Sequence, residues 1–181
     1  DKRGSSDYAS IKGRRRVCET KTSRLIMNLH LVIGTPMYGG MCTSEYTQSL
    51  LNLSESANKS GVKLTTIFLG NESLIQRGRN TIAHHFMNLP DATHLLFIDA
   101  DIKFRVEDIV KMIQADKSLI IGPVGLKGYN WDEIRQAAIN GEDDIQRTGG
   151  FFNINKLPGV DMVDENEPFE IEHGGNAFMM I

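Results

Sequence analysis

Short apolar segments alternate with amphipathic ones over residues 29–124. Apolar runs rich in branched and aromatic side chains predict strands at residues 29–34, 63–69, 94–98 and 119–124. The helical period between them predicts helices from Thr43 or Ser44 to about Lys59, from Ser73 to about Asn88, and over 106–114. Strands joined by helices of this length favour parallel pairing through right-handed crossovers. We therefore predict an α/β fold with an open, mostly parallel sheet and helices on both faces.

The pattern weakens after residue 124. A helix is expected at 131–140, a polar loop at 141–158, and later strands within 159–164 and 170–181. The final apolar run is followed by no cap or turn, so we expect the native protein to continue beyond it.

Composition places the chain among ordinary globular proteins. Of its 181 residues 40% are hydrophobic and 24% charged, and no stretch approaches the roughly 20 apolar residues of a membrane span. Residues 25–181 are expected to form one domain, and residues 1–24, which lack apolar periodicity, a disordered tail or linker. Cys18 and Cys42 indicate no disulfide framework, and the N-terminus lacks the apolar stretch of a secretory signal. A cytoplasmic location is therefore expected.

The formal net charge of −3 hides an uneven distribution. Residues 1–27 carry eight Lys or Arg against three Asp or Glu, so the remainder is acidic. The basic residues at 12–16 could touch nucleic acid or anionic lipid, but at the end of a chain a solvated tail is more common. We predict no nucleic-acid partner. An acidic domain that binds phosphate groups needs local positive charge from arginines or a metal ion.

Polar segments follow three of the predicted strands, at residues 35–40, 70–72 and 99–101. Ligands of open α/β sheets bind beyond the carboxyl ends of the strands. These three segments are therefore expected to line one site.

Asp99 and Asp101 directly follow the apolar strand at 94–98. Two carboxylates spaced in this way can direct oxygens to one hard cation, and Mg²⁺ or Mn²⁺ would complete its shell with waters and substrate phosphates. The alternative is a solvated turn or helix cap.

Arg77, Arg79 and Asn80 fall in the first turns of the helix that leads to Asp99. A helix N-terminus with guanidinium groups can bind a diphosphate through backbone N–H groups, the helix dipole and bidentate hydrogen bonds. The alternative is a solvated, charged helix face.

Taken together, these segments resemble the GT-A glycosyltransferases, and most closely the family-2-like and viral or phage-type members. The resemblance spans about residues 28–181 and implies a Rossmann-like nucleotide-binding core, here shortened at its C-terminal end. The segments that carry it, in the order those enzymes use, are residues 35–38, 77–80, 95–102 and 174–181.

The resemblance also implies roles for individual residues. Asp99 and Asp101 match the metal-binding Asp-x-Asp motif, with Asp99 also facing the donor nucleotide. Residues 172–176 match the acceptor side, where Glu172 or His173 could be a catalytic base or a further metal ligand, or else a structural residue at a strand end. The other matches are with positions that contact the nucleoside (Thr35, Pro36, Tyr38), the base or ribose (Asn71, Glu72) and the diphosphate (Arg79). Asn71 stands where the family more usually has an aspartate.

The expected activity is a metal-dependent, hexosyltransferase-like reaction. A sugar would pass from a nucleoside diphosphate sugar to a carbohydrate or other hydroxyl acceptor, with Mn²⁺ or Mg²⁺ and an arginine stabilising the leaving diphosphate. One alternative is a nucleotide- or carbohydrate-binding module without turnover. The other is an Asp-x-Asp phosphatase, which is disfavoured because such enzymes place the pair after the first strand.

Overall fold

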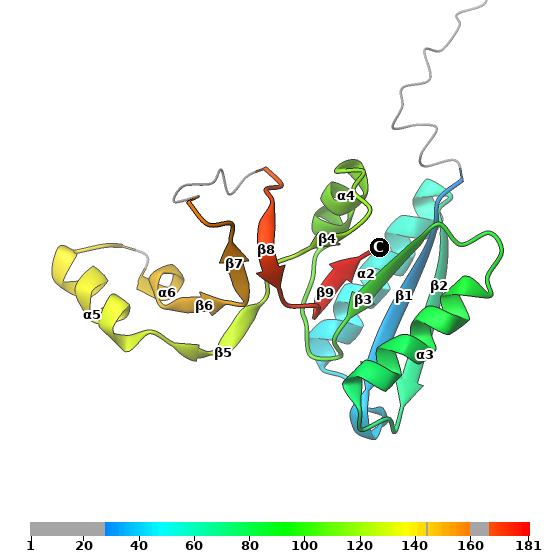
Figure 1. Cartoon of the computed structure of the whole chain (residues 1–181), viewed down its shortest axis with the longest axis horizontal. Helices are drawn as coiled ribbons and strands as arrows, with labels where there is room; N and C mark the ends of the chain where they lie inside the picture. The colour runs from blue at the N-terminus through cyan, green and yellow to red at the C-terminus, as the bar shows by residue number, and fades with distance from the viewer. Residues whose placement is uncertain (1–27, 144, 160–166) are drawn as a thin grey trace, which may run out of the picture.

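A mixed five-stranded sheet with strand order β2-β1-β3-β9-β4 forms the half of the molecule that is at the right in Figure 1. The computed structural model describes residues 28–143, 145–159 and 167–181. The expected tail at 1–24 and most of the expected strand at 159–164 lie outside these ranges. The strands are β1 (His30–Met37), β2 (Lys63–Gly70), β3 (His94–Ile98), β4 (Ile120–Ile121) and β9 (Phe178–Met180).

The strand directions confirm the α/β class and add one antiparallel strand. β1 pairs in parallel with both β2 and β3, whereas β9 is antiparallel to β3 and to β4. The sheet is therefore mixed, because the C-terminal strand inserts between β3 and β4.

Three helices cover the two faces of the sheet (Figure 1): α2 (Ser44–Ser60), α3 (Ile75–Met87) and α4 (Val106–Gln114). Thr43 caps α2 by accepting a hydrogen bond from the Tyr46 backbone N–H, and Gly61 ends it in the left-handed conformation. These limits, and those of α4, confirm the predicted helices. The helix predicted from Ser73 begins two residues later, because the Glu72 carboxylate holds the Leu74 N–H just before the first turn.

Alternate residues of the strands separate two hydrophobic clusters. On one face α3 packs through Ile82 onto Val32, Leu95 and Phe97. On the other face, α2 and α4 pack onto the strand residues that alternate with these and point away from α3. That second cluster contains Leu31, Ile33, Tyr46, Leu53, Leu96, Ile98, Phe104, Ile109, Met112, Phe178 and Met180. Helices on both faces were predicted, and the two clusters confirm them.

Two strand limits differ from the prediction. β1 continues to Met37 rather than ending at Gly34, because β2 pairs with it as far as Gly70. β4 covers only residues 120–121, because it pairs with β9 alone and Pro123 has no N–H to extend the ladder.

The polar loop expected at 141–158 is wrong, because that segment contains a short helix and two short strands. The helix expected at 131–140 and strands within 170–181 are confirmed. Except for β9, the described elements after residue 124 lie to one side of the sheet (Figure 1). β5 pairs with β6, and β7 pairs with β8, both antiparallel. The elements are β5 (Gly125–Tyr129), α5 (Trp131–Asn140), α6 (Ile145–Thr148), β6 (Gly150–Phe152), β7 (Ile154–Lys156) and β8 (Ile171–Gly174). Strands of three or four residues depend on partners far away in the chain, which the local pattern does not show.

None of the described helices combines the length and apolar character that crossing a bilayer demands.

Candidate functional site

The carboxyl ends of β1 and β3 meet where the chain changes direction across the sheet. From β1 the chain passes to β2 on one side and returns to β3 on the other. In open α/β sheets ligands bind at such switch points, beyond the carboxyl ends of the strands. Pairing of β1 with β3 ends at Gly34 and Phe97, and Asp99 follows two residues later.

Asp99 is bound to Arg79 at this edge. Nη2 of Arg79 donates a hydrogen bond of 2.6 Å to Oδ1 of Asp99, and the two side chains are 12% and 33% exposed. The backbone N–H of Asp99 donates to the carbonyl of Ala177, just before β9, at 2.9 Å. Asp99 is therefore held from α3 and from the C-terminal strand together.

The charge state of Asp99 reflects opposing influences. Burial raises the pKa of its carboxyl group, the positive charge and hydrogen bond of Arg79 lower it, and the negative charge of Asp101 raises it. Together these influences raise the pKa of Asp99 above that of an ordinary aspartate. Arg79 thus offsets part of the cost of keeping a carboxylate half-buried.

Asp101 is the more accessible of the two aspartates, with 44% of its side chain exposed. Nζ of Lys127, on β5, lies 2.7 Å from its Oδ2, and the Lys127 side chain is 90% exposed. The interaction raises the pKa of Lys127, first through the hydrogen bond and then through the charge of Asp101. Sequence reasoning missed Lys127, because a lone lysine 26 residues further along carries no signal of this contact.

The turn that carries both aspartates is anchored at its backbone. Ile102 N–H donates to the Asp99 carbonyl at 3.1 Å, and Thr43 N–H donates to the Ala100 carbonyl at 2.9 Å. The N-terminus of α2 therefore lies against this turn.

The residues predicted to contact the nucleoside have different environments. Thr35 is fully buried and shares a 2.6 Å hydrogen bond with the Tyr46 hydroxyl, so its side chain serves the core. Pro36 is half-buried within β1 rather than in a loop. Tyr38 is exposed on a short 3-10 helix, η1 (Tyr38–Gly40), directly after β1.

The two arginines bind different carboxylates. Arg77 donates to both carboxylate oxygens of Glu72, through Nε at 2.5 Å and Nη2 at 2.7 Å. Hydrogen bonds from Arg77 and from the Leu74 N–H lower the pKa of Glu72 to about 2. Glu72 and Arg77 are therefore occupied with each other at the start of α3. Asn80 is exposed, and so is Asn71, which adopts the left-handed conformation at φ 60°.

Glu172 and His173 lie on β8, in the pair that β8 forms with β7. Their side chains are exposed, and His173 Nε2 lies 3.8 Å from Glu172 Oε2. No hydrogen bond or ion pair joins either residue to Asp99 or Asp101 within the part of the chain that the structure describes.

A divalent cation at this edge would take Asp99 and Asp101 as its protein ligands. The described ranges contain no group of three or more Asp, Glu, His or Cys side chains arranged to hold a metal. Two carboxylates still suit Mg²⁺ or Mn²⁺, which keep waters and take further oxygens from phosphates. The Lys127 ammonium group forms an ion pair with Asp101, so the Asp101 carboxylate already binds a positive charge.

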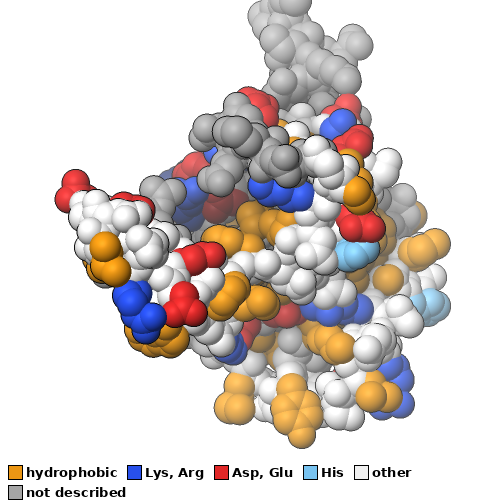
Figure 2. All heavy atoms as spheres, turned by 60° about the vertical axis from the view of Figure 1, so that its left-hand side comes forward, with side chains coloured by type: hydrophobic (Ala, Val, Ile, Leu, Met, Phe, Trp, Pro, Cys, Tyr) orange, Lys and Arg blue, Asp and Glu red, His pale blue; other side chains and the backbone are white. Residues whose placement is uncertain are grey.

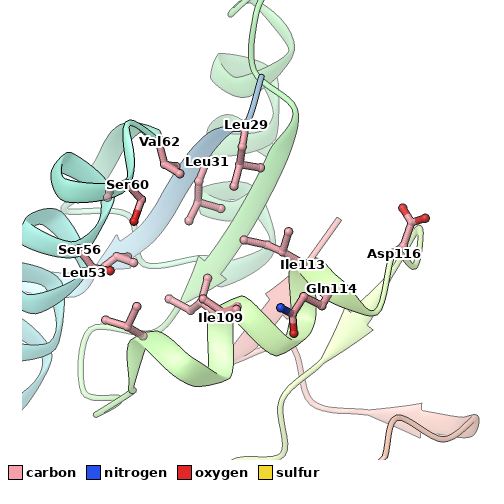
Figure 3. Close-up of a pocket in the computed structure, with 13 residues that line it drawn as sticks. Leu29, Leu31, Leu53, Ser56, Ser60, Val62, Ile109, Ile113, Gln114 and Asp116 are labelled. Atoms are coloured by element: carbon pink, nitrogen blue, oxygen red, sulfur yellow. The ribbon is translucent and has the colours of Figure 1, made fainter. Parts of the chain in front are cut away.

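A separate apolar cavity of about 310 Å³ lies between α2 and α4, near the amino end of β1 (Figure 3). Leu29, Leu31, Leu53, Ile109 and Ile113 are among its lining residues. Its polar lining residues are Ser56, Ser60, Gln114 and Asp116, with no Lys or Arg to balance a diphosphate. None of the lining residues belongs to the aspartate site, so the cavity is distinct from that site.

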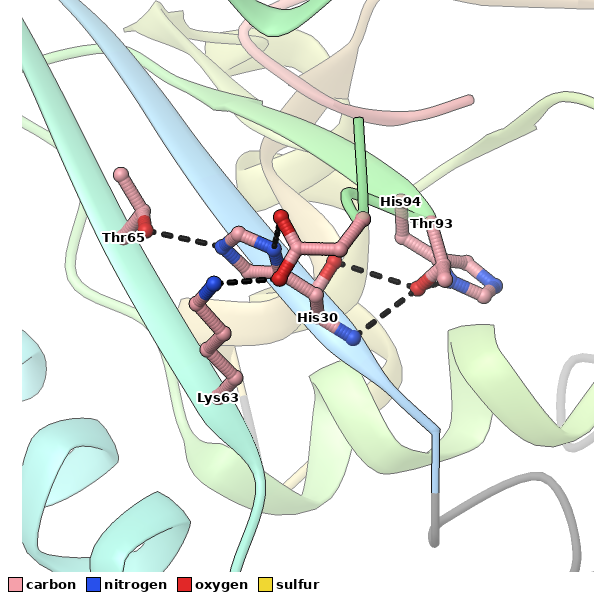
Figure 4. Close-up of polar contacts among 6 residues, drawn as sticks. His30, Lys63, Thr65, Thr93 and His94 are labelled. Atoms are coloured by element: carbon pink, nitrogen blue, oxygen red, sulfur yellow. Dashed lines mark hydrogen bonds and ion pairs between the residues drawn. The ribbon is translucent and has the colours of Figure 1, made fainter. Parts of the chain in front are cut away.

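A buried histidine ties the strands together at the same amino end (Figure 4). His30 Nε2 lies 2.8 Å from the Thr65 hydroxyl on β2, and its Nδ1 lies 3.3 Å from Asp91 Oδ1. The Thr93 hydroxyl accepts from the His30 N–H and donates to the His30 carbonyl, both at 3.1 Å. His30 therefore joins β1 to β2 and to the segment before β3, at the end of the sheet opposite Asp99 and Asp101.

Hydrophobic side chains are also exposed on the elements beside the sheet. The rings of Tyr129 and Trp131 lie 5.7 Å apart, and both side chains are exposed. Figure 2 turns this side of the molecule forward and shows hydrophobic side chains interspersed with charged ones.

No family model matches this chain, and no curated protein matches it. Among solved structures it is similar to one described as "Crystal Structure of A197 from STIV", with 14% identity and a TM-score of 0.49. The alignment covers 84% of this chain and 64% of that one, so this chain spans less than two thirds of that protein. These comparisons assign no family to the chain.

Proposed function

We propose that this chain is the donor-binding core of a metal-dependent glycosyltransferase with a GT-A, Rossmann-like fold. Its substrates would be a nucleoside diphosphate sugar and a carbohydrate or other hydroxyl acceptor. The strand order β2-β1-β3 supports this proposal, because it forms a switch point where nucleotides bind in open α/β sheets.

The observation that carries the proposal is the pair of aspartates at this switch point. Asp99 is oriented by Arg79, whereas Asp101 is accessible on the same turn. This combination provides one fixed and one adaptable carboxylate for a cation that is shared with a diphosphate.

The proposed chemistry is electrostatic. When bound, the cation supplies positive charge that stabilises the leaving diphosphate. Arg79 holds Asp99 in place through Nη2, and its buried Nε has no hydrogen-bond partner among the described residues. An unpaired buried donor is unusual, so this guanidinium retains a hydrogen bond that it could still donate.

The remaining roles follow from position. Tyr38 is exposed beside the switch point, where a nucleoside could contact its ring. Glu172 and His173 precede the segment whose Ala177 carbonyl binds Asp99, which supports a place for them on the acceptor side. One of them would deprotonate the acceptor hydroxyl.

Binding without turnover is the second candidate function. Its support is that, among the described residues, no side-chain hydrogen bond or ion pair joins Glu172 or His173 to Asp99 or Asp101, whereas Glu172 and His173 pair with each other. A protein of this kind would bind the donor and leave it intact.

Calorimetry with a set of nucleoside diphosphates, with and without Mn²⁺, tests the proposal. We expect Mn²⁺-dependent binding to the unmodified chain and its loss in Asp101→Asn. Asp132→Asn, which removes an exposed carboxylate on α5, is the control and should behave like the unmodified chain. Equal affinity with and without Mn²⁺ would overturn the metal assignment, and failure of every nucleotide to bind would overturn the donor assignment. Incubation with nucleotide sugars and sugar acceptors then separates transfer from binding alone.

A further inference from the structure

Each aspartate of the site has its own cation, and the two ion pairs differ in burial. The Arg79 side chain is largely enclosed, whereas the Lys127 side chain is almost entirely exposed. An enclosed pair stays in one geometry, but an exposed ammonium on a flexible stem exchanges readily with water and other partners. Asp99 therefore has a fixed partner and Asp101 an exchangeable one.

The backbone keeps Lys127 near the site. The chain leaves β4 and the sheet at Gly122, before β5 begins, and the Gly122 N–H donates to the Phe178 carbonyl at 2.8 Å. A Cβ on Gly122 would lie 2.3 Å from the Phe178 ring, so this exit point is tightly packed. Lys127 is five residues further on, in the part of β5 where pairing with β6 is irregular.

We propose that Lys127 is an exchangeable phosphate ligand of the site. The Lys127 ammonium group pairs with the Asp101 carboxylate when no metal is bound. When a divalent cation binds that carboxylate, the ammonium group moves to the diphosphate. This inference rests on the proposed function. It adds to the site a residue that lies outside the segments following the strand ends.

Electrostatics gives the exchange its direction. A divalent cation on Asp101 would place two positive charges within a few ångströms of the ammonium, and repulsion at that distance is strong. Lys127 Nζ uses one of its three N–H donors on Asp101, and among the described residues it makes no other hydrogen bond. Phosphate oxygens of a diphosphate on the same cation would accept from it, since lysine binds phosphate as a point charge.

The test compares Lys127→Ala with the unmodified chain in two binding measurements. Mn²⁺ alone is titrated first, with free Mn²⁺ followed by electron paramagnetic resonance. Inorganic pyrophosphate is then titrated by calorimetry at saturating Mn²⁺, because it carries the diphosphate without any choice of base. Loss of the exposed competing pair should strengthen Mn²⁺ binding about two- to fivefold. Loss of the phosphate contact should weaken pyrophosphate binding about tenfold.

Two further variants complete the design. Lys127→Arg keeps the charge and should retain most of the pyrophosphate affinity. Lys59→Ala removes an exposed lysine that is likewise paired with a carboxylate, Glu55, far along α2, and should change neither affinity. All of these side chains are exposed, so the variants should fold normally.

Opposite shifts of the two affinities in Lys127→Ala support the proposal. It is overturned if both affinities match those of Lys59→Ala, if both fall together, or if Mn²⁺ binding strengthens while pyrophosphate binding is unchanged. If the unmodified chain binds neither Mn²⁺ nor pyrophosphate, the proposed function itself fails. If the unmodified chain binds both Mn²⁺ and pyrophosphate and Lys127→Ala changes neither affinity, only the role of Lys127 is overturned.

Discussion

Cγ2 of Ile82 lies 2.4 Å from the point that a Cβ atom on Gly34 would occupy, so α3 crosses β1 in direct contact with its backbone. Arg79 is one turn before Ile82 on the same helix. The close approach therefore helps to bring Arg79 to Asp99 at the carboxyl end of β3.

Gly34→Ala should destabilise the fold. The added methyl group must displace Ile82, and overpacking of this kind typically costs about 1–3 kcal/mol of the free energy of unfolding. Urea denaturation measures the loss. Gly128→Ala is the matched control, because a Cβ there meets nothing within 4 Å. Equal stability of the two variants would show that α3 moves away at no cost.

Arg79 and Asp99 should be energetically coupled. Arg79→Met leaves a half-buried carboxylate without its cation and is expected to cost roughly 1–3 kcal/mol of stability. Adding Asp99→Asn should recover part of that loss. Urea denaturation of the single and double variants gives the coupling energy. Arg135→Met is the control, because Arg135 forms an exposed ion pair with Asp132, and it should change stability by no more than about 0.5 kcal/mol. Simple additivity at Arg79 and Asp99 would contradict the coupling.

Acidification should weaken Mn²⁺ binding at a higher pH than an ordinary aspartate would cause. Burial raises the pKa of Asp99, so the folded chain takes up this proton at a higher pH than the unfolded chain does. A protonated carboxyl group is a poor ligand, and affinity is lost as the pH falls through the folded pKa. The same proton uptake favours the folded state, so the contribution of Asp99 to stability increases on acidification. Mn²⁺ titrations over a pH series measure the midpoint, and a midpoint at or below about 3.9 would contradict the expected direction.

A chain that begins at residue 25 should keep its metal-dependent nucleotide binding. The removed residues lack apolar periodicity and precede β1, so no core contact is expected from them. Calorimetry on the shortened chain is the measurement. A clear loss of affinity would mean that the basic residues contribute to the site.

The central elements could be predicted because their signals are local. The apolar run before Asp99 forms β3. Thr43 caps the start of α2 and Gly61 caps its end, through hydrogen bonds to residues a few positions away. The polar edge containing Asp99 and Asp101 was predictable for the same reason, since parallel strands place their carboxyl ends together. Thr35 could not be placed from the sequence, because its burial depends on Tyr46 packing over it.

The alternation of strands and helices, and the two carboxylates at the end of β3, can be recognised in the amino-acid sequence. The folded structure adds that β9 inserts antiparallel between β3 and β4, and that Arg79 binds Asp99 while Lys127 binds Asp101. The two kinds of feature differ in the distance along the chain between the interacting groups. A helix or a cap forms from groups a few residues apart, whereas these pairings join groups 20 or more residues apart, and folding of the whole domain brings them together.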